Sequence, residues 1–306
     1  MPFFLAIDGG GSKTSCVVGN ESSVLGKSIA PGSNLIRVGN EKARAALQEG
    51  IQQACLQAAI TPSQIIRTCI GLAGGARPEI ANLVHELVAE IVPGEIEVVG
   101  DMEIARYAAF ADAPGVVVIA GTGSIAYGRN SRGRFARAGG WGFQISDEGS
   151  GHWIGRSAIT SVLRAYDEGE NPLLLQALMK AWDAESREKL VIMANSSPYP
   201  DFATLLPAIL PAADGGDPMA RAVLAEAGAE LAGLAKIVIR RIFPERETAP
   251  VAMAGGVFGN SALVRQVFYN SLRSEFPEVA PKPKVVEPVF GALDLARKST
   301  LRSTGT

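Results

Sequence analysis

A run of glycines near the amino terminus is suited to phosphate binding. It reads Asp8-Gly9-Gly10-Gly11-Ser12-Lys13-Thr14 and lies between two apolar segments. Glycine admits positive φ angles and leaves room for a ligand, so the backbone N–H groups can form an anion-binding nest. Ser12, Lys13 and Thr14 add donors, and the Asp8 carboxylate can hold a hydrated Mg²⁺ near phosphates. The alternative is a plain hairpin turn with a solvated lysine.

A second glycine turn occurs in mid-chain. Gly121-Thr122-Gly123-Ser124-Ile125-Ala126 formally fits the Gly-x-Gly-x-x-Gly/Ala dinucleotide fingerprint. That fingerprint needs a helix directly afterwards, whereas residues 127–133 have the pattern of a hairpin. We therefore expect the glycine N–H groups and the Thr122 hydroxyl to meet a phosphate. Neither turn is a Walker A motif, because Gly26-Lys27-Ser28 has Glu21 where the first glycine belongs.

A third glycine segment lies in the last quarter of the chain and reads Ala254-Gly255-Gly256-Val257-Phe258-Gly259-Asn260. It connects an apolar strand-like run to a helical pattern. A glycine pair at the carboxyl end of a strand lets a flat ring or a phosphate lie on the backbone. The alternative is a simple strand-to-helix turn capped by Asn260.

Alternating strands and helices must position these turns. In the first half, we expect strands at 3–7, 14–19, 22–29, 67–73 and 96–100, and helices at 79–91, at 102–111 and from an Asn40 cap through 58. In the second half, we expect strands at 116–120, 125–128, 134–138 and 251–254, and helices at 151–166, 173–180, 186–194, 218–243, 261–276 and 291–298. Asp217 and Pro218 form the clearest helix start. The glycine-turned hairpin thus occurs twice, at Asp8 and again at Gly121, as an architectural repeat.

The composition excludes several classes of protein. The chain has 306 residues, 29 basic and 31 acidic, with a formal charge of −2, so it lacks the basic field of a nucleic-acid binder. No apolar run reaches the roughly 20 residues of a membrane span, and the amino terminus lacks the basic region of a signal peptide, so we expect a cytoplasmic protein. The three cysteines, Cys16, Cys55 and Cys69, fit core positions. Two histidines give little support for a Ser-His-Asp relay or a zinc site.

Taken together, the three glycine segments resemble the phosphate 1, phosphate 2 and adenosine motifs of the actin, hexokinase and Hsp70 ATPase superfamily. Within it, Gly139-Gly140-Trp141-Gly142-Phe143-Gln144-Ile145-Ser146-Asp147-Glu148-Gly149-Ser150-Gly151 resembles the signature of the N-acetylglucosamine kinase family, part of the BadF/BadG/BcrA/BcrD-type ATPase group. The resemblance implies an α/β fold of two ribonuclease-H-like domains with mixed sheets flanked by helices, closing over a cleft. The domains would be 1–113 and 114–290, with a helix at about 291–306 packing back on the first.

The resemblance also implies which residues bind the substrates. The sugar contacts would be Asn34, Asp101, Ser124, Gly140, Trp141, Gly142 and Asp147. The ATP contacts would be Gly10, Gly11, Ser12, Lys13, Thr14, Gly121, Thr122, Gly123, Ala213, Gly255 and Gly256, with Mg²⁺ held near Asp8 through water. The Ser12-Lys13 pair departs from the pairs in some relatives, which leaves the contact of Lys13 with the γ-phosphate open.

Such a kinase needs a carboxylate to accept the proton of the sugar hydroxyl as phosphoryl transfer proceeds. Asp101 is the candidate base because it ends an apolar strand, although it could also cap the helix that follows. Asp147 and Glu148 could accept hydrogen bonds from sugar hydroxyls or only favour a helix N-terminus. Trp141 could lie against the apolar face of a sugar or belong to the core, where we expect Trp153 and Trp182.

We expect an ATP- and Mg²⁺-dependent kinase that acts on the 6-hydroxyl of N-acetylglucosamine. Glucosamine kinases, kinases of muramic-type sugars and ATPase activators with a bridging iron–sulfur cluster belong to the same group. The positions of the three cysteines in strand and helix patterns disfavour such a cluster. A homodimer is expected by family analogy alone.

Overall fold

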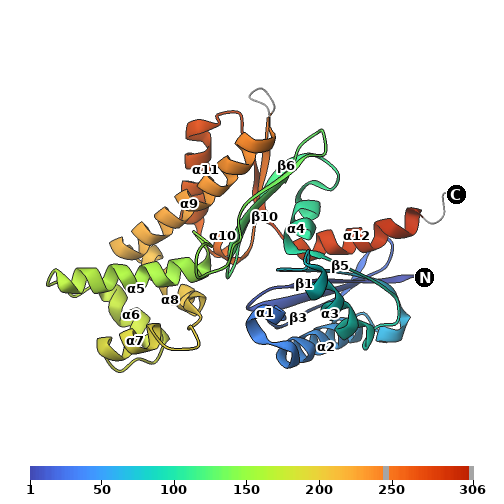
Figure 1. Ribbon diagram of the computed structural model, residues 1–306, viewed down its shortest axis with the longest axis horizontal. Coiled ribbons are helices and arrows are strands. Elements are labelled where there is room, and N and C mark those ends of the chain that lie inside the picture. The colour runs from blue at the N-terminus through green and yellow to red at the C-terminus, as the bar shows by residue number, and fades with distance from the viewer. Residues whose placement is uncertain (244–247, 303–306) are drawn as a thin grey trace. The chain divides into compact units, whose positions relative to one another are not determined.

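The computed structural model describes residues 1–243 and 248–302, and the described chain divides into two compact units (Figure 1). One unit is Pro114–Val285, and the other combines Met1–Ala113 with the carboxyl-terminal segment that begins at Val286. Each unit is built on one five-stranded sheet flanked by helices. This confirms the α/β class with two mixed sheets.

The sheet of the first unit has the order β3-β2-β1-β4-β5. Its strands are β1 (Phe3–Gly9), β2 (Lys13–Gly19), β3 (Val24–Pro31), β4 (Ile65–Leu72) and β5 (Glu95–Gly100). Strands β1, β2 and β3 are antiparallel neighbours, whereas β1, β4 and β5 run parallel. The carboxyl ends of β1, β4 and β5 therefore meet at one edge of the sheet, which is where a ligand site is expected in such folds.

Alternating side chains of β1 supply a core on each face of this sheet. Leu5 and Ile7 pack with α2 (Asn40–Gln57) and α3 (Pro78–Ala89), while Phe4 and Ala6 pack with α4 (Asp101–Phe110) and α12 (Pro288–Arg302). The short helices α1 (Leu35–Val38) and η1 (Pro62–Gln64) lie in the connections. The three cysteines are buried in these cores, as expected.

The second unit repeats the same arrangement, with the strand order β10-β9-β6-β7-β8. Its strands are β6 (Gly115–Ala120), β7 (Ser124–Arg129), β8 (Phe135–Gly139), β9 (Pro250–Ala254) and β10 (Ala280–Val286). Its helices are α5 (Gly151–Asp167), α6 (Leu173–Ala181), α7 (Arg187–Ala194), η2 (Phe202–Leu205), α8 (Leu206–Asp214), α9 (Pro218–Ile242), α10 (Gly256–Asn260) and α11 (Ala262–Glu275). Helix α9 packs along the sheet and against α11, and α6, α7 and α8 gather beside α5 (Figure 1).

The sequence predicted some of the helix N-cap residues correctly and others wrongly. The Asp217 side chain caps α9 as expected, since Oδ1 accepts the Ala220 N–H at 2.9 Å. Asn40 was expected to cap α2, but it is the first helical residue, and Gly39 is the N-cap because its φ of +78° suits glycine. Asn260 does not cap the helix that follows either. Ser261 does, through a bond from the Val264 N–H at 3.2 Å.

The sequence analysis did not predict helix α8 or strand β10, because both contain prolines. Helix α8 carries Pro207 in its first turn and Pro211 inside it, and β10 contains Pro281 and Pro283. Proline lowers helix and strand propensity, and in sheets it is confined mainly to edges, which is the place that β10 has in the strand order. Among residues 1–243 and 248–302, no helix combines the length and apolarity needed to cross a bilayer.

Candidate functional site

The first glycine turn joins β1 to β2 and is held by the loop that follows β3. The Gly10 N–H donates to the Lys13 carbonyl at 3.0 Å, and the Gly10 carbonyl accepts the N–H groups of Ser33 and Asn34 at 3.2 and 3.3 Å. A Cβ atom on Gly10 would lie 2.8 Å from the Lys13 carbonyl oxygen. Neither Gly9 nor Gly10 has a positive φ, so the turn does not use the left-handed backbone that glycine permits at these two positions. Close packing is what requires glycine there.

The three side chains of the first turn that were expected to bind phosphate differ in their exposure to solvent. Ser12 and Lys13 are exposed at the tip of the hairpin, whereas Thr14 is fully buried. Thr14 Oγ1 lies 2.8 Å from both the Pro31 carbonyl oxygen and Ser33 Oγ. The Thr14 hydroxyl therefore ties the hairpin to the end of β3. The expected contact of Thr14 with ATP stays a prediction.

Two carboxylates stand at the ligand edge of the first sheet. Asp8 lies near the end of β1 and Asp101 directly after β5, with β4 between these strands. Burial raises the pKa of Asp8 from 3.8 to about 7; the Asp101 charge adds to this rise, and the Lys13 ammonium opposes it. Burial also raises the pKa of Asp101, against two backbone hydrogen bonds that favour its ionised form. Burial thus destabilises the ionised form of both carboxyl groups, so that a nearby cation or a bound proton stabilises each of them.

Asp101 is held by the helix that it begins. It is the first residue of α4, after the Gly100 N-cap, and its Oδ1 accepts the Met102 N–H at 2.9 Å. The capping role and the role of a base were alternatives in the sequence, and this geometry is compatible with both. The bond to Met102 fixes the direction of the carboxylate, which a positioned base requires.

Asn34 lies beside the first glycine turn and caps α1. Its Oδ1 accepts the Ile36 N–H at 3.1 Å, and its backbone N–H binds the Gly10 carbonyl. Within the described chain, its Nδ2 makes no hydrogen bond. The amide group is thus oriented at one end and available as a donor at the other.

The sequence analysis did not identify the loop after β4 as part of the candidate site. It contains Gly74, with a φ of +84°, and Gly75, where a Cβ would lie 2.3 Å from the Val99 carbonyl oxygen. Since β4 lies between β1 and β5, this loop follows the strand that separates the two carboxylates. The signal was present, because a glycine pair after a strand is the same pattern as in the three turns that were recognised.

The second glycine turn joins β6 to β7 and is fastened to the start of α5. The Gly121 N–H donates to the Gly123 carbonyl at 2.9 Å, and the Gly121 carbonyl accepts the Gly151 N–H at 2.8 Å. Ser124 is buried, and its Oγ donates to the Glu148 carbonyl at 2.7 Å. The Ser124 hydroxyl thus holds the loop before α5 against the turn, and its expected contact with the sugar stays a prediction.

Asp147 is built into this turn. Its side chain is only 7% exposed, its φ is +68°, and its Oδ2 lies 2.8 Å from the place where a Cβ on Gly123 would stand. Ser150 caps α5, since its Oγ accepts the Trp153 N–H at 3.1 Å. The expected alternative, that Asp147 only favours the helix N-terminus, does not account for a buried carboxylate in a strained conformation.

The segment before Asp147 exposes an aromatic ring. Gly140 and Gly142 have φ angles of +70° and +104°, which turn the chain sharply on both sides of Trp141. The Trp141 side chain is 66% exposed, and the Arg137 guanidinium lies 4.0 Å from its ring centroid. The core alternative for Trp141 is therefore wrong. Trp153 and Trp182 do pack against the core, as expected.

The third glycine turn follows β9. Gly255 has a φ of +96°, and a Cβ there would lie 2.4 Å from the Ala120 carbonyl oxygen, so the turn packs on the end of β6. Ala213, expected to contact ATP, is buried in α8. An open hollow of about 500 Å³ lies between the starts of α9 and α11, lined by Gly216, Pro218, Arg221, Ala222, Ala225 and Leu263.

The residues of the first unit fit the chemistry of a magnesium nucleotide. The Gly10 turn and the exposed Lys13 ammonium offer donors for phosphate oxygens, and Asp8 is a hard oxygen ligand whose ionised form a cation would stabilise. No cluster of three or more His, Cys, Asp or Glu suited to a metal occurs in the described ranges. Mg²⁺ does not require such a cluster, because it is usually bound by one or two carboxylates together with phosphates and water.

Two sheets with one strand order, each with a glycine turn after its first strand, define a fold that recurs in solved structures. The model of the BadF/BadG/BcrA/BcrD ATPase family matches residues 5–296, and the chain belongs to this family.

Similar proteins include several named as kinases. The chain is 32% identical to an N-acetylmuramic acid/N-acetylglucosamine kinase of Clostridium acetobutylicum, covering 97% of this chain and 99% of the relative. It is 30% identical to an N-acetyl-D-glucosamine kinase of Dictyostelium discoideum, covering 97% and 98%. A crystal structure described as a putative N-acetylglucosamine kinase from Porphyromonas gingivalis has the same fold, with a TM-score of 0.76 at 22% identity over 98% of this chain and 100% of that one.

Proposed function

We propose that this ATP-dependent sugar kinase transfers the γ-phosphate of ATP to the 6-hydroxyl of N-acetylglucosamine. The observation that carries the proposal is the carboxylate pair at one sheet edge, where Asp101 follows β5 and Asp8 stands beside the glycine turn of β1. Family membership and full-length similarity to two amino-sugar kinases support it.

The nucleotide is assigned to the glycine turns. The turns at Gly10 to Lys13 and at Gly121 to Gly123 bind the phosphates, with help from Ser12, Lys13 and Thr122. The Gly10 and Gly121 N–H groups close the turns themselves, so the phosphate donors are the other N–H groups of these segments. Thr14 acts indirectly, because its buried hydroxyl holds the first turn in place. The adenosine lies on Gly255 and Gly256, near the hollow that follows Ala213.

Three polar side chains are assigned to the sugar. Asn34 donates from Nδ2 and Asp101 accepts from the reacting hydroxyl, while Asp147 accepts from another hydroxyl. Gly140, Trp141 and Gly142 supply backbone groups and an aromatic face. Ser124 positions the Asp147 loop through its bond to the Glu148 carbonyl.

In the reaction, the 6-oxygen attacks the γ-phosphorus, the bond to the β-phosphate oxygen breaks, and ADP leaves. The hydroxyl proton passes to Asp101, and burial raises the pKa of this carboxyl, which makes its carboxylate a stronger proton acceptor. Mg²⁺, when bound near Asp8, neutralises charge on the phosphates. The bond from the Met102 N–H holds the base in position while the proton moves.

A panel of sugars tests the proposal. Release of ADP is measured with N-acetylglucosamine, glucosamine, N-acetylmuramic acid, glucose and no sugar. We expect N-acetylglucosamine to stimulate ADP release most strongly. If no sugar raises the rate above the sugar-free value, the kinase assignment fails and an ATPase activator becomes the better assignment. A preference for glucosamine would mean that the substrate is the sugar with a free amine at position 2, with a hydroxyl still accepting the phosphate.

A further inference from the structure

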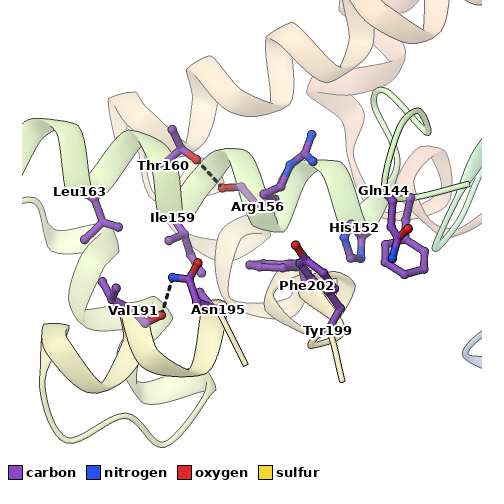
Figure 2. Close-up of a pocket in the computed structure, with 12 residues that line it drawn as sticks. Gln144, His152, Arg156, Ile159, Thr160, Leu163, Val191, Asn195, Tyr199 and Phe202 are labelled. Atoms are coloured by element: carbon purple, nitrogen blue, oxygen red, sulfur yellow. Dashed lines mark hydrogen bonds between the residues drawn. The ribbon is translucent and has the colours of Figure 1, made fainter. Parts of the chain in front are cut away.

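A cavity of about 510 Å³ opens in the second unit beside α5 (Figure 2). Its volume is within the range of about 300–1,000 Å³ that is common for ligand pockets. Polar side chains come from three segments: Gln144 from the chain before α5, Arg156 and Thr160 from α5, and Asn195 and Tyr199 from the chain after α7. None of the residues assigned to ATP or to the sugar lines this cavity, so transfer to a single sugar unit leaves it unused.

A tight turn joins the assigned sugar contacts to this cavity. The Gly142 carbonyl accepts the N–H groups of Ile145 and Ser146 at 3.1 and 2.9 Å. Gly142 begins this turn and Asp147 directly follows it, and both are assigned to the sugar. Phe143, inside the turn, lines the cavity. A turn closed by an i→i+4 bond spans about 5 Å, the rise of one helical turn. The cavity therefore begins about one sugar unit away from these contacts.

Aromatic packing fixes the wall of the cavity on this side. The buried His152 ring lies 4.7 Å from the Phe143 ring and 5.1 Å from the Phe202 ring, measured between centroids. The backbone of the same residue supports the second glycine turn, because the His152 N–H donates to the Thr122 carbonyl at 3.3 Å. The start of α5 thus holds the cavity wall and the expected phosphate turn together. A wall that is held in this way is preorganised for a ligand.

The walls combine an exposed aromatic ring with uncharged polar groups. Tyr199 is 65% exposed, and Gln144, Thr160 and Asn195 supply amides and a hydroxyl. Among the described residues that line the cavity, Arg156 is the one arginine, and lysine, aspartate and glutamate are absent. Sugars present C–H faces to aromatic rings and hydroxyl groups to amides and guanidinium groups. These walls therefore match an uncharged ligand with several hydroxyls better than a strongly charged one.

We propose that the cavity is a subsite for a second sugar unit, and that the enzyme also phosphorylates a disaccharide of amino sugars. The inference rests on the proposed function and adds a substrate class to it. One unit occupies the assigned sugar contacts, and the other lies on the Tyr199 ring with its hydroxyls near Gln144 and Asn195. The 6-oxygen of the first unit attacks the γ-phosphorus, the bond to the β-phosphate oxygen breaks, and Asp101 receives the hydroxyl proton. The products are ADP and a disaccharide phosphate, and the glycosidic bond stays intact.

The test compares N-acetylglucosamine with its 1,4-linked dimer, N,N′-diacetylchitobiose, in wild-type and variant protein. Release of ADP gives the rates, and mass spectrometry identifies the product of the dimer, which we expect to be a disaccharide monophosphate. Tyr199→Ala should lower the ratio of kcat/KM for the dimer to that for the monomer by about 2- to 10-fold, the value of one aromatic contact. Asn195→Trp, which fills the cavity from an exposed position, should lower this ratio at least about tenfold.

Tyr166→Ala is the matched control. Tyr166 is an exposed tyrosine of α5 that does not line the cavity, and the Arg187 guanidinium of α7 lies 3.6 Å from its ring centroid. We expect the wild-type ratio in this variant, whereas a general loosening of these helices would lower the ratio here too.

The inference is overturned if N-acetylglucosamine is phosphorylated but the dimer is not. It is also overturned if either Tyr199→Ala or Asn195→Trp leaves the ratio at the wild-type value, or if Tyr166→Ala lowers the ratio as much as they do. If no sugar is phosphorylated, the proposed function itself fails, which is a separate outcome.

Discussion

Replacing Asp8 by Asn should make the first unit more stable while it removes activity. The rise of the Asp8 pKa from 3.8 to about 7 corresponds to about 4 kcal/mol, at about 1.4 kcal/mol for each tenfold change in proton affinity. This is the free energy that the native fold loses by keeping the carboxylate ionised in a buried position next to Asp101. The neutral amide avoids that penalty, but it must still find hydrogen bonds. We therefore expect a gain of about 2 kcal/mol at about pH 8.

The sign of the pH dependence follows from the direction of the pKa change. Between about pH 4 and pH 7, native Asp8 binds a proton that the unfolded chain releases, so the free energy of unfolding falls as the pH rises through this window. Below about pH 4 the carboxyl is protonated in both states, and Asp8→Asn should lose its advantage. The difference between the two proteins should thus grow from acid to neutral pH and then level off.

Urea unfolding at several pH values measures this difference, with circular dichroism and hydrogen exchange of the β1–β2 peptides as probes of the first unit. All three tryptophans, Trp141, Trp153 and Trp182, belong to the second unit, so their fluorescence is an internal reference that should not change. Asp112→Asn is the control, because Asp112 is an exposed carboxylate that forms a surface ion pair with Lys298. If the free energy of unfolding had the same pH dependence in wild type and Asp8→Asn, the argument that burial destabilises the ionised Asp8 carboxylate would be refuted.

Three other variants test separate parts of the site. Asp101→Asn should lower kcat by about 10²- to 10⁴-fold with ADP binding retained, and near-normal turnover would exclude it as the base. Gly255→Ala should cost about 2–3 kcal/mol in unfolding monitored by tryptophan fluorescence, because φ is +96° and the Cβ would meet the Ala120 carbonyl oxygen; Gly259→Ala, with open space around it, should not. Trp141→Ala should change stability by less than about 0.5 kcal/mol yet raise the sugar KM up to about tenfold, and an unchanged KM would remove the ring from the sugar site.

The sequence was sufficient to locate the glycine turns and their strands. Each turn interrupts an apolar run, and the repeat of this pattern at Asp8 and Gly121 reflects a repeated sheet with one strand order. Local rules succeed here because adjacent antiparallel strands need a short turn and glycine permits it.

Roles that depend on distant packing could not be predicted in this way. The sequence predicts Thr14 as a phosphate ligand. In the fold, its hydroxyl bonds to the Pro31 carbonyl at the end of β3 and to Ser33 in the loop that follows. Ser124 is similarly occupied by the Glu148 carbonyl. The loop at Gly74 gains significance only from the place of β4 between the strands of the two carboxylates, and strand order is not a local property.

The cavity beside the sugar signature illustrates the same limit. Its walls come from α5, from the end of α7 and from the segment before η2, so its residues share no motif. Arg156 reads as an ordinary surface residue of an amphipathic helix. Only the folded arrangement shows that it borders a cavity without a carboxylate partner.

The position of the transferred phosphate tests the proposed kinase reaction most directly. The protein is incubated with ATP, Mg²⁺ and N-acetylglucosamine, and the product is examined by ³¹P–¹H correlation NMR. We expect a phosphomonoester signal coupled to the two protons on carbon 6, formed in equal amount with ADP. A signal coupled to the anomeric proton, or ADP and free phosphate without any sugar phosphate, would contradict transfer to the 6-hydroxyl.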